Sequence, residues 1–305
     1  MGALSDPSEG TGYSARPLGA REMLRSGLLL ADGAMGTMLG LGGADFFVPE
    51  ELNLRAPERV AAVHAAYVAA GSRLVSTNTF GASPAKLALA GLDDRAGEIN
   101  LRAASIARSA VGARALVAGS IGPTGRFLEP LGDLSELDAL SGFVLQAQCL
   151  AEGGADLLIV ETMSSLDEAR LAVRAAVRAG LPVVATMTFE PTTHGEPRTM
   201  MGVTLSELLD LLEEGAEVVG LNCGQGPATM AAMAARLREL SPDARLAAQP
   251  NAGAPRLSSS AAVWDVTPAD LADFARQMKA LGFALVGGCC GSTPEHIRAM
   301  REAIR

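Results

Sequence analysis

The amino-acid sequence predicts a parallel (β/α)8 barrel, and three observations support this fold class. Short apolar segments, often β-branched, alternate with helical patterns rich in Ala, Leu and Arg, which favours a parallel sheet. Eight such units fit into about 285 residues, close to the ~250 residues typical of this barrel. The first strand-like segment leads into DGAMG, which differs from the GxGxxG turn of a dinucleotide-binding, doubly wound sheet.

The eight expected strands are apolar runs that end in small or polar residues. They cover residues 28–35, 73–80, 115–123, 156–162, 182–189, 217–223, 245–253 and 283–290.

Helix-start and helix-stop residues separate these segments. Pro57 opens a helical pattern that ends at Gly71, which fits the preference for proline at the first turn and glycine after the last. Ser135 stands three residues before Asp138, as in a capping box. The last helical pattern starts at Thr293-Pro294-Glu295, with proline in the first turn and an acid near the positive end of the helix. These signals predict that each strand is followed by a helix.

Composition narrows the classes of protein that this chain can be. Its 305 residues are 49% hydrophobic, which is enough for a large core. The net charge of −9 and the missing basic patch argue against nucleic acid as a partner. Four cysteines do not suggest a disulfide framework, so we expect a reducing, cytoplasmic location. No apolar run reaches the ~18 residues of a membrane span.

We expect residues 1–20, rich in Gly, Ser and Pro, to be a disordered arm, and residues 21–305 to be the barrel.

In such a barrel the functional residues lie at the carboxyl ends of the strands. Asp32 and Glu161 each follow an apolar run directly, LLLA and LLIV, where an unpaired buried charge would be costly. Their cationic partner is either an ammonium group of a substrate or a nearby arginine. Other polar side chains share this position, and each could instead cap the following helix: Asn78, Thr79, Ser120, Thr162, Thr188, Asn222 and Asn251.

Three cysteines also stand at expected strand ends. Cys223 follows EVVGLN, and the adjacent pair Cys289 and Cys290 follows FALVGG. Adjacent cysteines rarely bond to each other, because the disulfide ring is strained. Free cysteine often only packs in the core, and Cys149, in a helical pattern, is expected to do so. Three thiols at strand ends predict a zinc site with an open fourth position.

A zinc site of this kind favours sulfur chemistry. A free thiol has a pKa near 8.5 and is a weak nucleophile until it ionises. Zinc deprotonates a bound thiol, and three cysteine thiolates would leave its sulfur electron-rich and able to attack an alkyl group. Among the three histidines we expect no metal ligand, although His296 lies six residues after Cys290.

The motifs resemble the homocysteine S-methyltransferase family over nearly all of residues 27–305. The matching stretches are ADGAMGTML, STNTFGAS, GSIGPTG, VETMSS, GLNCGQGP, QPNAGAP and GGCCGSTPEHI. The resemblance implies methyl transfer to the zinc-bound thiolate of homocysteine, which makes methionine. It implies that zinc is bound, and catalysis carried, by Cys223, Cys289 and Cys290. It also implies substrate-binding residues: Asp32 and Glu161 for the amino group, amides of Gly33 and Ala34 for the carboxylate, and Asn78, Thr79 and Asn222 lining the pocket.

The resemblance leaves the methyl donor open. GGCCGSTPEHI and PNAG look like the homocysteine module of cobalamin-dependent methionine synthase, whereas VETMSS, RTMMGV and NCGQG look closer to bacterial betaine–homocysteine methyltransferases. The sequence ends at Arg305 after the eighth helix, so a corrinoid or methyl-folate donor is expected to need a separate partner protein. Betaine would require an aromatic box, for which Phe80, Phe127 and Phe189 are candidates.

Two other functions fit parts of the pattern. A non-catalytic zinc-thiolate module that binds or presents thiols would keep the cysteines but would not need Asp32 and Glu161. An aldolase-like barrel would need a Schiff-base lysine at a strand end, yet Lys86 and Lys279 both lie in helical patterns.

Overall fold

Eight parallel strands form a nearly closed barrel in the computed structural model, which describes residues 19–40, 48–193, 195–254, 256–258 and 261–305. The strands are β1 (Leu29–Leu30), β2 (Leu74–Ser76), β3 (Leu116–Ile121), β4 (Leu157–Met163), β5 (Val183–Met187), β6 (Val218–Asn222), β7 (Leu246–Gln249) and β10 (Leu285–Val286). Their order around the barrel is β1-β10-β7-β6-β5-β4-β3-β2. The (β/α)8 fold class and all eight expected strand positions are confirmed.

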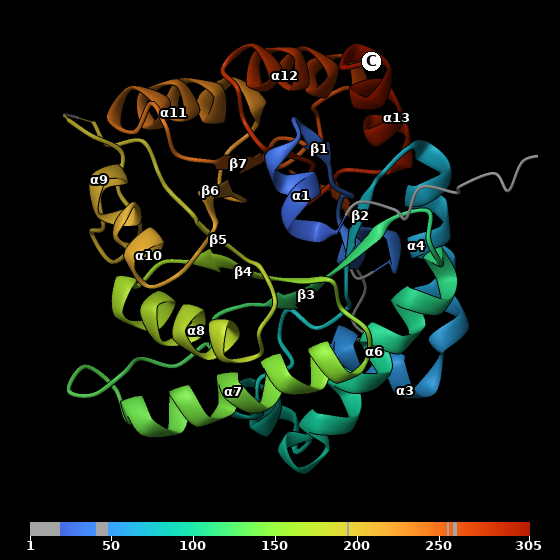
Figure 1. Ribbon diagram of the computed structural model, residues 1–305, viewed down its shortest axis with the longest axis vertical. Coiled ribbons are helices and arrows are strands. Elements are labelled where there is room, and N and C mark those ends of the chain that lie inside the picture. The colour runs from blue at the N-terminus through green and yellow to red at the C-terminus, as the bar shows by residue number, and fades with distance from the viewer. Residues whose placement is uncertain (1–18, 41–47, 194, 255, 259–260) are drawn as a thin grey trace, which may run out of the picture.

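The barrel closes between its first two strands. The Arg73 backbone N–H, just before β2, donates to the Leu30 carbonyl of β1 (2.8 Å), and the Ser72 hydroxyl donates to the Ala31 carbonyl (3.2 Å). These bonds complete the ring that Figure 1 shows. A closed ring leaves no long strand edge exposed, and it brings all eight carboxyl ends to one mouth.

Side chains alternate between the barrel interior and the layer under the helices. Leu157 and Ile159 of β4 pack in the interior with Leu29 and Leu285, whereas Leu158 and Val160 face the helices. This period of two follows from the pleat of a strand. Strands buried on both faces read as continuous apolar runs, which is why they were predictable from the sequence.

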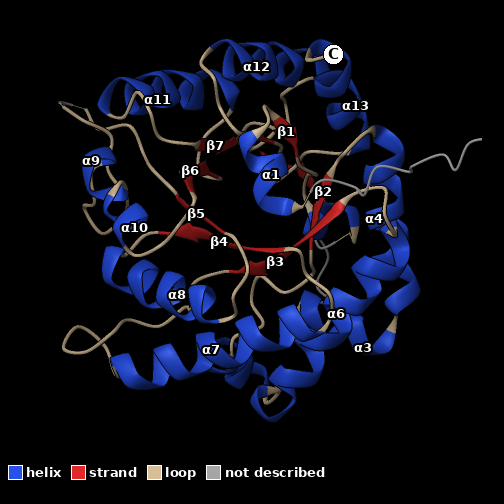
Figure 2. Cartoon of the chain, viewed as in Figure 1, coloured by secondary structure: helices blue, strands red, loops and turns tan. Residues whose placement is uncertain are grey.

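Helices form the outer layer, as Figure 2 shows. The larger ones are α4 (Pro57–Ala70), α6 (Ala96–Val111), α7 (Glu136–Glu152), α8 (Leu166–Arg178), α11 (Pro227–Leu240), α12 (Pro268–Ala280) and α13 (Pro294–Ala303). The predicted caps are confirmed. Gly71 ends α4 with φ +111°, and Ser135 accepts from the Asp138 amide (3.1 Å) at the start of α7.

Shorter elements fill the connections: α2 (Met35–Met38), η1 (Pro49–Glu51), α3 (Leu52–Arg55), α5 (Pro84–Leu87), η2 (Ala88–Ala90), η3 (Asp93–Arg95), α9 (Leu205–Leu208) and α10 (Asp210–Glu213). The loop after β7 contains a hairpin of β8 (Arg256–Ser258) and β9 (Ala261–Val263).

Helix α1 (Ala20–Arg25) lies across the amino-terminal end of the barrel, where Ala20 and Leu24 pack on the interior cluster. The expected disordered arm, residues 1–20, falls almost wholly outside the described residues. No helix in the described ranges is long and apolar enough to cross a membrane.

Candidate metal centre

The three predicted cysteines meet at the mouth of the barrel. Cys223 follows β6, and Cys289 and Cys290 follow β10, with β7 between the two strands. Their sulfur atoms all lie within 4.8 Å of one another, and the Sγ atoms of Cys223 and Cys290 are 3.8 Å apart. All three side chains are half-buried and unoxidised. This is a cluster of soft donor atoms of the size that one metal ion needs.

The thiols perturb one another because they are close. Hydrogen bonds from Cys289 and Cys290 lower the pKa of Cys223 to about 3. The hydrogen bond with Cys223 raises the pKa of Cys290 to about 12, and hydrogen bonds with Cys223 and Cys290 raise that of Cys289 well above its usual value. Without a metal the cluster therefore carries one thiolate that two neutral thiols solvate. A divalent cation would replace the two remaining protons, so the residues fit such an ion.

An unpaired oxygen beside the thiols supports the same fit. Asn251 follows β7, and its side chain forms a hydrogen bond that lowers the pKa of Cys223. Its Oδ1 atom is buried and has no hydrogen-bond partner within the described ranges. A buried carbonyl oxygen rarely stays unpaired without a reason, and a cation beside the thiols would give it a partner.

Cys149 and His296 were not expected to be metal ligands, and both have other partners. Cys149 of α7 packs towards α6, where a Cβ on Gly97 would lie 3.6 Å from its sulfur. The His296 ring accepts from the Thr293 amide (3.2 Å) and lies 3.0 Å from the Val266 carbonyl, so it caps α13.

Asn222 fixes the strand ends that carry the site. Its Oδ1 accepts from the Thr162 amide (2.8 Å) and the Thr186 hydroxyl (2.9 Å), and its Nδ2 donates to the Thr162 hydroxyl (2.7 Å). Nδ2 also lies 4.0 Å from Cys289 Sγ.

Thr162 and Cys223 both adopt left-handed backbone, with φ of +60° and +59°. Such strain in non-glycine residues persists only where the surroundings enforce it, and it clusters at functional sites.

The loop that carries the cysteine pair is held from both sides. The Ser292 hydroxyl donates to the Cys289 carbonyl (2.6 Å) and accepts from the Ala34 amide (3.2 Å). The buried Tyr67 hydroxyl of α4 lies 3.0 Å from the Ala34 carbonyl and 3.1 Å from the Ser292 carbonyl. On the other side Gly291, with φ +80°, lies so close to the Trp264 ring that no Cβ would fit.

Asp32 and Glu161 are carboxyls at the same mouth, and neither forms an ion pair within the described ranges. Ser76 donates to Asp32 through its amide (2.9 Å) and hydroxyl (3.3 Å), and the Ser120 hydroxyl donates to Glu161. Burial raises the pKa of Asp32 to about 8, with a smaller contribution from the Glu161 charge. Burial also raises the pKa of Glu161 to about 7. The alternative of an arginine partner is therefore not what the structure shows.

The backbone after Asp32 offers a further polar group. The Ala34 amide is already bonded to Ser292, whereas the Gly33 amide has no partner in the described ranges. A Cβ on Gly33 would lie 3.0 Å from the Tyr67 hydroxyl, so glycine keeps this turn tight.

Asn78 and Thr79 are turned to partners inside the protein. The Asn78 amide donates to the Pro49 carbonyl (2.8 Å), and the Thr79 hydroxyl donates to the Ser120 carbonyl (2.7 Å). Both side chains are buried. These bonds hold the ends of β2 and β3 in place, and the predicted role of both residues in lining a substrate pocket stays a prediction.

Sequence reasoning missed three supporting residues: Ser76, Tyr67 and Ser292. Ser76 belongs to β2, the neighbour of the strand that leads to Asp32, so barrel topology alone could have suggested it. Tyr67 lies on a helix more than 30 positions from its partners, and nothing in the sequence signals that contact.

The chain also resembles known proteins throughout its length. It is 34% identical over 309 aligned positions to a methionine synthase of Mycobacterium tuberculosis, and equally to that of Mycobacterium leprae. These alignments cover 93% of this chain but 25% of either mycobacterial protein. Thus the chain spans about a quarter of the length of those relatives.

Solved structures give the same result. The metallated form of the homocysteine methyltransferase MmuM from Escherichia coli superposes with a TM-score of 0.75 at 26% identity, over 92% of this chain and 98% of that one. Its oxidised form superposes with a TM-score of 0.73 at 27% identity, over 90% and 95%. The family model described as homocysteine S-methyltransferase matches residues 29–304. The family predicted from the sequence motifs is confirmed, and the chain belongs to the homocysteine S-methyltransferase family.

Proposed function

We propose that this protein is a zinc-dependent homocysteine S-methyltransferase that converts homocysteine to methionine. The observation that carries the proposal is the joint presence, at one barrel mouth, of the cysteine cluster and two carboxyls, buried Asp32 and half-buried Glu161, neither of which has a cationic partner within the described ranges. A metal-binding module that served only to hold thiols would need the first feature and not the second.

The donor set favours zinc. Cys223, Cys289 and Cys290 supply three soft ligands, and a tetrahedral ion then keeps one position for a substrate. Zinc, when bound, supplies a Lewis acid that favours the ionised form of a thiol at neutral pH. The metallated state of the Escherichia coli relative supports a metal in this family.

The protein's own residues orient the amino-acid part of the substrate. The carboxyls of Asp32 and Glu161 bind its ammonium group, which supplies the cation that both lack. The unpaired Gly33 amide binds its carboxylate, with the rigid Tyr67–Ser292 contacts holding that turn in place. The thiol then points to the cysteine cluster, because Glu161 and Cys223 are near enough to interact electrostatically.

The first candidate for the methyl donor is a corrinoid or methyl-folate system, because GGCCGSTPEHI and PNAG resemble the homocysteine module of cobalamin-dependent methionine synthase. Betaine is the second candidate. Its expected aromatic box has weak support, because Phe189 is buried, the Phe80 ring faces Lys86 at 5.7 Å, and Phe127 is 57% exposed.

One assay tests the proposal. Zinc-loaded protein is incubated with homocysteine and, in parallel, with betaine, S-methylmethionine or methylcobalamin, and methionine is measured. We expect methionine from one of these donors, loss of zinc and activity in Cys289→Ser, and retention of both in Cys149→Ser. A fully loaded protein that forms no methionine with any donor, including after addition of a corrinoid protein, would instead support the passive thiol-binding module.

A further inference from the structure

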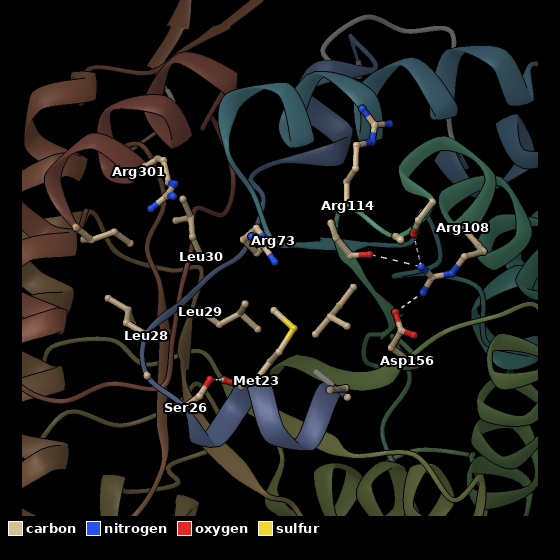
Figure 3. A pocket seen from close by; sticks show the side chains of 18 residues that line it. Met23, Ser26, Leu28, Leu29, Leu30, Arg73, Arg108, Arg114, Asp156 and Arg301 are labelled. Atoms are coloured by element: carbon tan, nitrogen blue, oxygen red, sulfur yellow. Dashed lines mark hydrogen bonds and ion pairs between the residues drawn. The ribbon is translucent and has the colours of Figure 1, made fainter. Parts of the chain in front are cut away.

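A second cavity lies at the end of the barrel opposite the cysteine cluster. It has a volume of about 780 Å³, within the range of small-molecule sites. Its walls come from the amino-terminal ends of the strands and from α1, which lies along one side (Figure 3). Met23, Leu28, Leu29 and Ile304 give it an apolar surface.

Four arginines and a single acid line this cavity, and two of the arginines are already engaged. The Arg108 guanidinium pairs with Asp156 and also donates to the Gly112 carbonyl (2.7 Å). Arg114 donates to the Ala110 carbonyl (2.7 Å), and Figure 3 shows its guanidinium turned away from the cavity.

The other two, Arg73 and Arg301, have no acceptor for their guanidinium groups within the described ranges. Figure 3 shows both pointing towards the cavity, beside Leu29 and Leu30. The fold fixes where both side chains start. The Arg73 backbone joins β1 to β3 through hydrogen bonds of 2.8 and 2.9 Å, and the Arg301 stem packs on Gly71, where a Cβ would meet its Cγ at 2.7 Å.

We propose that this cavity binds a small organic phosphate, with Arg73 and Arg301 holding the phosphate group and the apolar wall holding the organic part. Guanidinium groups match the geometry of phosphate oxygens, and two of them balance a dianion. The net charge of the protein is −9, so two arginines at one cavity with no acid beside them in the described part of the chain are a local exception to its overall charge.

The proposed site is independent of methyl transfer. Parallel strands place their amino ends on one side of the barrel and their carboxyl ends on the other, so a ligand here touches neither the cysteines nor Asp32. It would contact α1, which covers this end of the barrel interior.

The test uses phenyl phosphate as probe and the metal-loaded protein of residues 1–305, with calorimetry at fixed ionic strength. We expect one phenyl phosphate per chain, with affinity at least about tenfold weaker in the double variant Arg73→Gln, Arg301→Gln. Arg114→Gln, at the same cavity but turned away, and Arg178→Gln, on the distant surface of α8, are matched controls and should bind as the wild type does.

Three outcomes would overturn the proposal: equal affinity in the double variant and the wild type, a binding signal that equimolar inorganic phosphate fully reproduces, or displacement of the probe by homocysteine. Circular dichroism of the double variant checks that lost binding does not reflect unfolding. Retained zinc in that variant confirms that the cysteine cluster at the other end is intact.

Discussion

Asp32 and Glu161 owe their raised pKa values to burial, with no ion-pair partner in the part of the chain that the structure describes. A carboxylate inside a protein normally pairs with a basic group, because desolvation of the charge is costly. Here serine donors replace the basic group, and they do not fully compensate for burial, so both carboxyls hold protons at higher pH than usual. A substrate ammonium would reverse that shift. The ligand-free site is therefore poised to take up a cation.

A pH dependence of stability follows for the metal-free protein. The unfolded chain releases the Asp32 proton near pH 4, whereas the folded protein holds it up to about pH 8. The folded state therefore binds more protons between these values, and the contribution of Asp32 to stability falls as pH rises from 4 to 8. Each unit of pKa difference is worth about 1.4 kcal/mol. Denaturant unfolding at pH 5 to 8 should show a flatter decline in Asp32→Asn than in the wild type.

Asp133→Asn is the matched control for that measurement. Its carboxyl is exposed, and Arg126 lowers rather than raises its pKa. The decline between pH 5 and 8 should be the same as in the wild type. If Asp32→Asn also keeps the wild-type slope, the Asp32 carboxyl is ionised in the folded protein and the burial argument is wrong.

The same carboxyls should determine substrate affinity. Loss of a charge-assisted hydrogen bond to the ammonium group costs about 1.5–3 kcal/mol, which is roughly 10- to 150-fold in affinity. Calorimetry of Asp32→Asn and Glu161→Gln should show homocysteine binding weakened by that factor with zinc content unchanged. Unchanged affinity in both variants would contradict the assignment.

For single residues, the sequence allowed the residues of the site to be predicted, but not the hydrogen-bond partners that position them. Cys223, Cys289 and Cys290 were recognisable because each follows an apolar run whose carboxyl end must reach the barrel mouth. Asp32 was recognisable for the same reason. Its donor Ser76 lies 44 positions away, and the pair depends on the register of two strands. Such contacts exist only once the chain is folded, so single residues gave no sign of them.

At the scale of elements, the ends of β4, β5 and β6 form one hydrogen-bonded unit centred on Asn222. The register of β4 on β5 shifts between Val160 and Met163, which places Glu161 and Thr162 in an irregular stretch. An irregularity of this kind re-aims side chains next to functional sites. Asn222 satisfies the displaced Thr162 amide and hydroxyl, so the shape of the mouth depends on one side chain.

Asn222→Ala should therefore damage the site more than the fold. It leaves the buried Thr186 hydroxyl without its partner, at a cost of about 1–3 kcal/mol before relaxation or water entry, and it also removes the partner of the half-buried Thr162 amide. We expect lower stability in denaturant unfolding and weaker zinc retention against a chelator. Thr186→Val removes only one of these bonds and keeps the shape, so its effect on zinc should be much smaller. Equal zinc retention in Asn222→Ala and wild type would show that Asn222 does not position the cysteines.

The extent of each element was harder to predict than its existence. The segments 28–35 and 283–290 appear as the two-residue strands β1 and β10, because their carboxyl halves leave the ladder to form the turns that carry Gly33 and the cysteine pair. The loop after β7 contains the hairpin β8–β9, for which residues 256–263 offered no apolar alternation. At the two short strands, local pattern gives way to contacts with distant segments, such as the bond from the Ala34 amide to Ser292.

At the scale of the whole molecule, the cysteine cluster joins parts of the barrel that the sheet joins only indirectly. Cys223 belongs to the end of β6 and the cysteine pair to the end of β10, with β7 between them. The ring itself is closed next to this region, between β1 and β2, by the hydrogen bonds from Arg73 and Ser72 to the β1 segment. A metal held by all three thiolates would thus act as a clamp across the mouth.

Removal of the metal should consequently destabilise the entire barrel and not only the mouth. A ligand that binds the folded state alone stabilises it by RT ln(1 + [L]/Kd), about 4 kcal/mol at a thousandfold excess over Kd. For a domain of this size that corresponds to a fall in Tm on the order of 5–10 °C after chelation. Differential scanning calorimetry of the wild type, with and without chelator, should show this fall and its reversal by added zinc. Cys149→Ser should behave like the wild type, whereas Cys289→Ser should already melt at the lower temperature and respond little to chelator, because its clamp is incomplete. If the Tm of the wild type does not change after chelation, no metal bound by the three thiols stabilises the fold, and the predicted clamp is wrong.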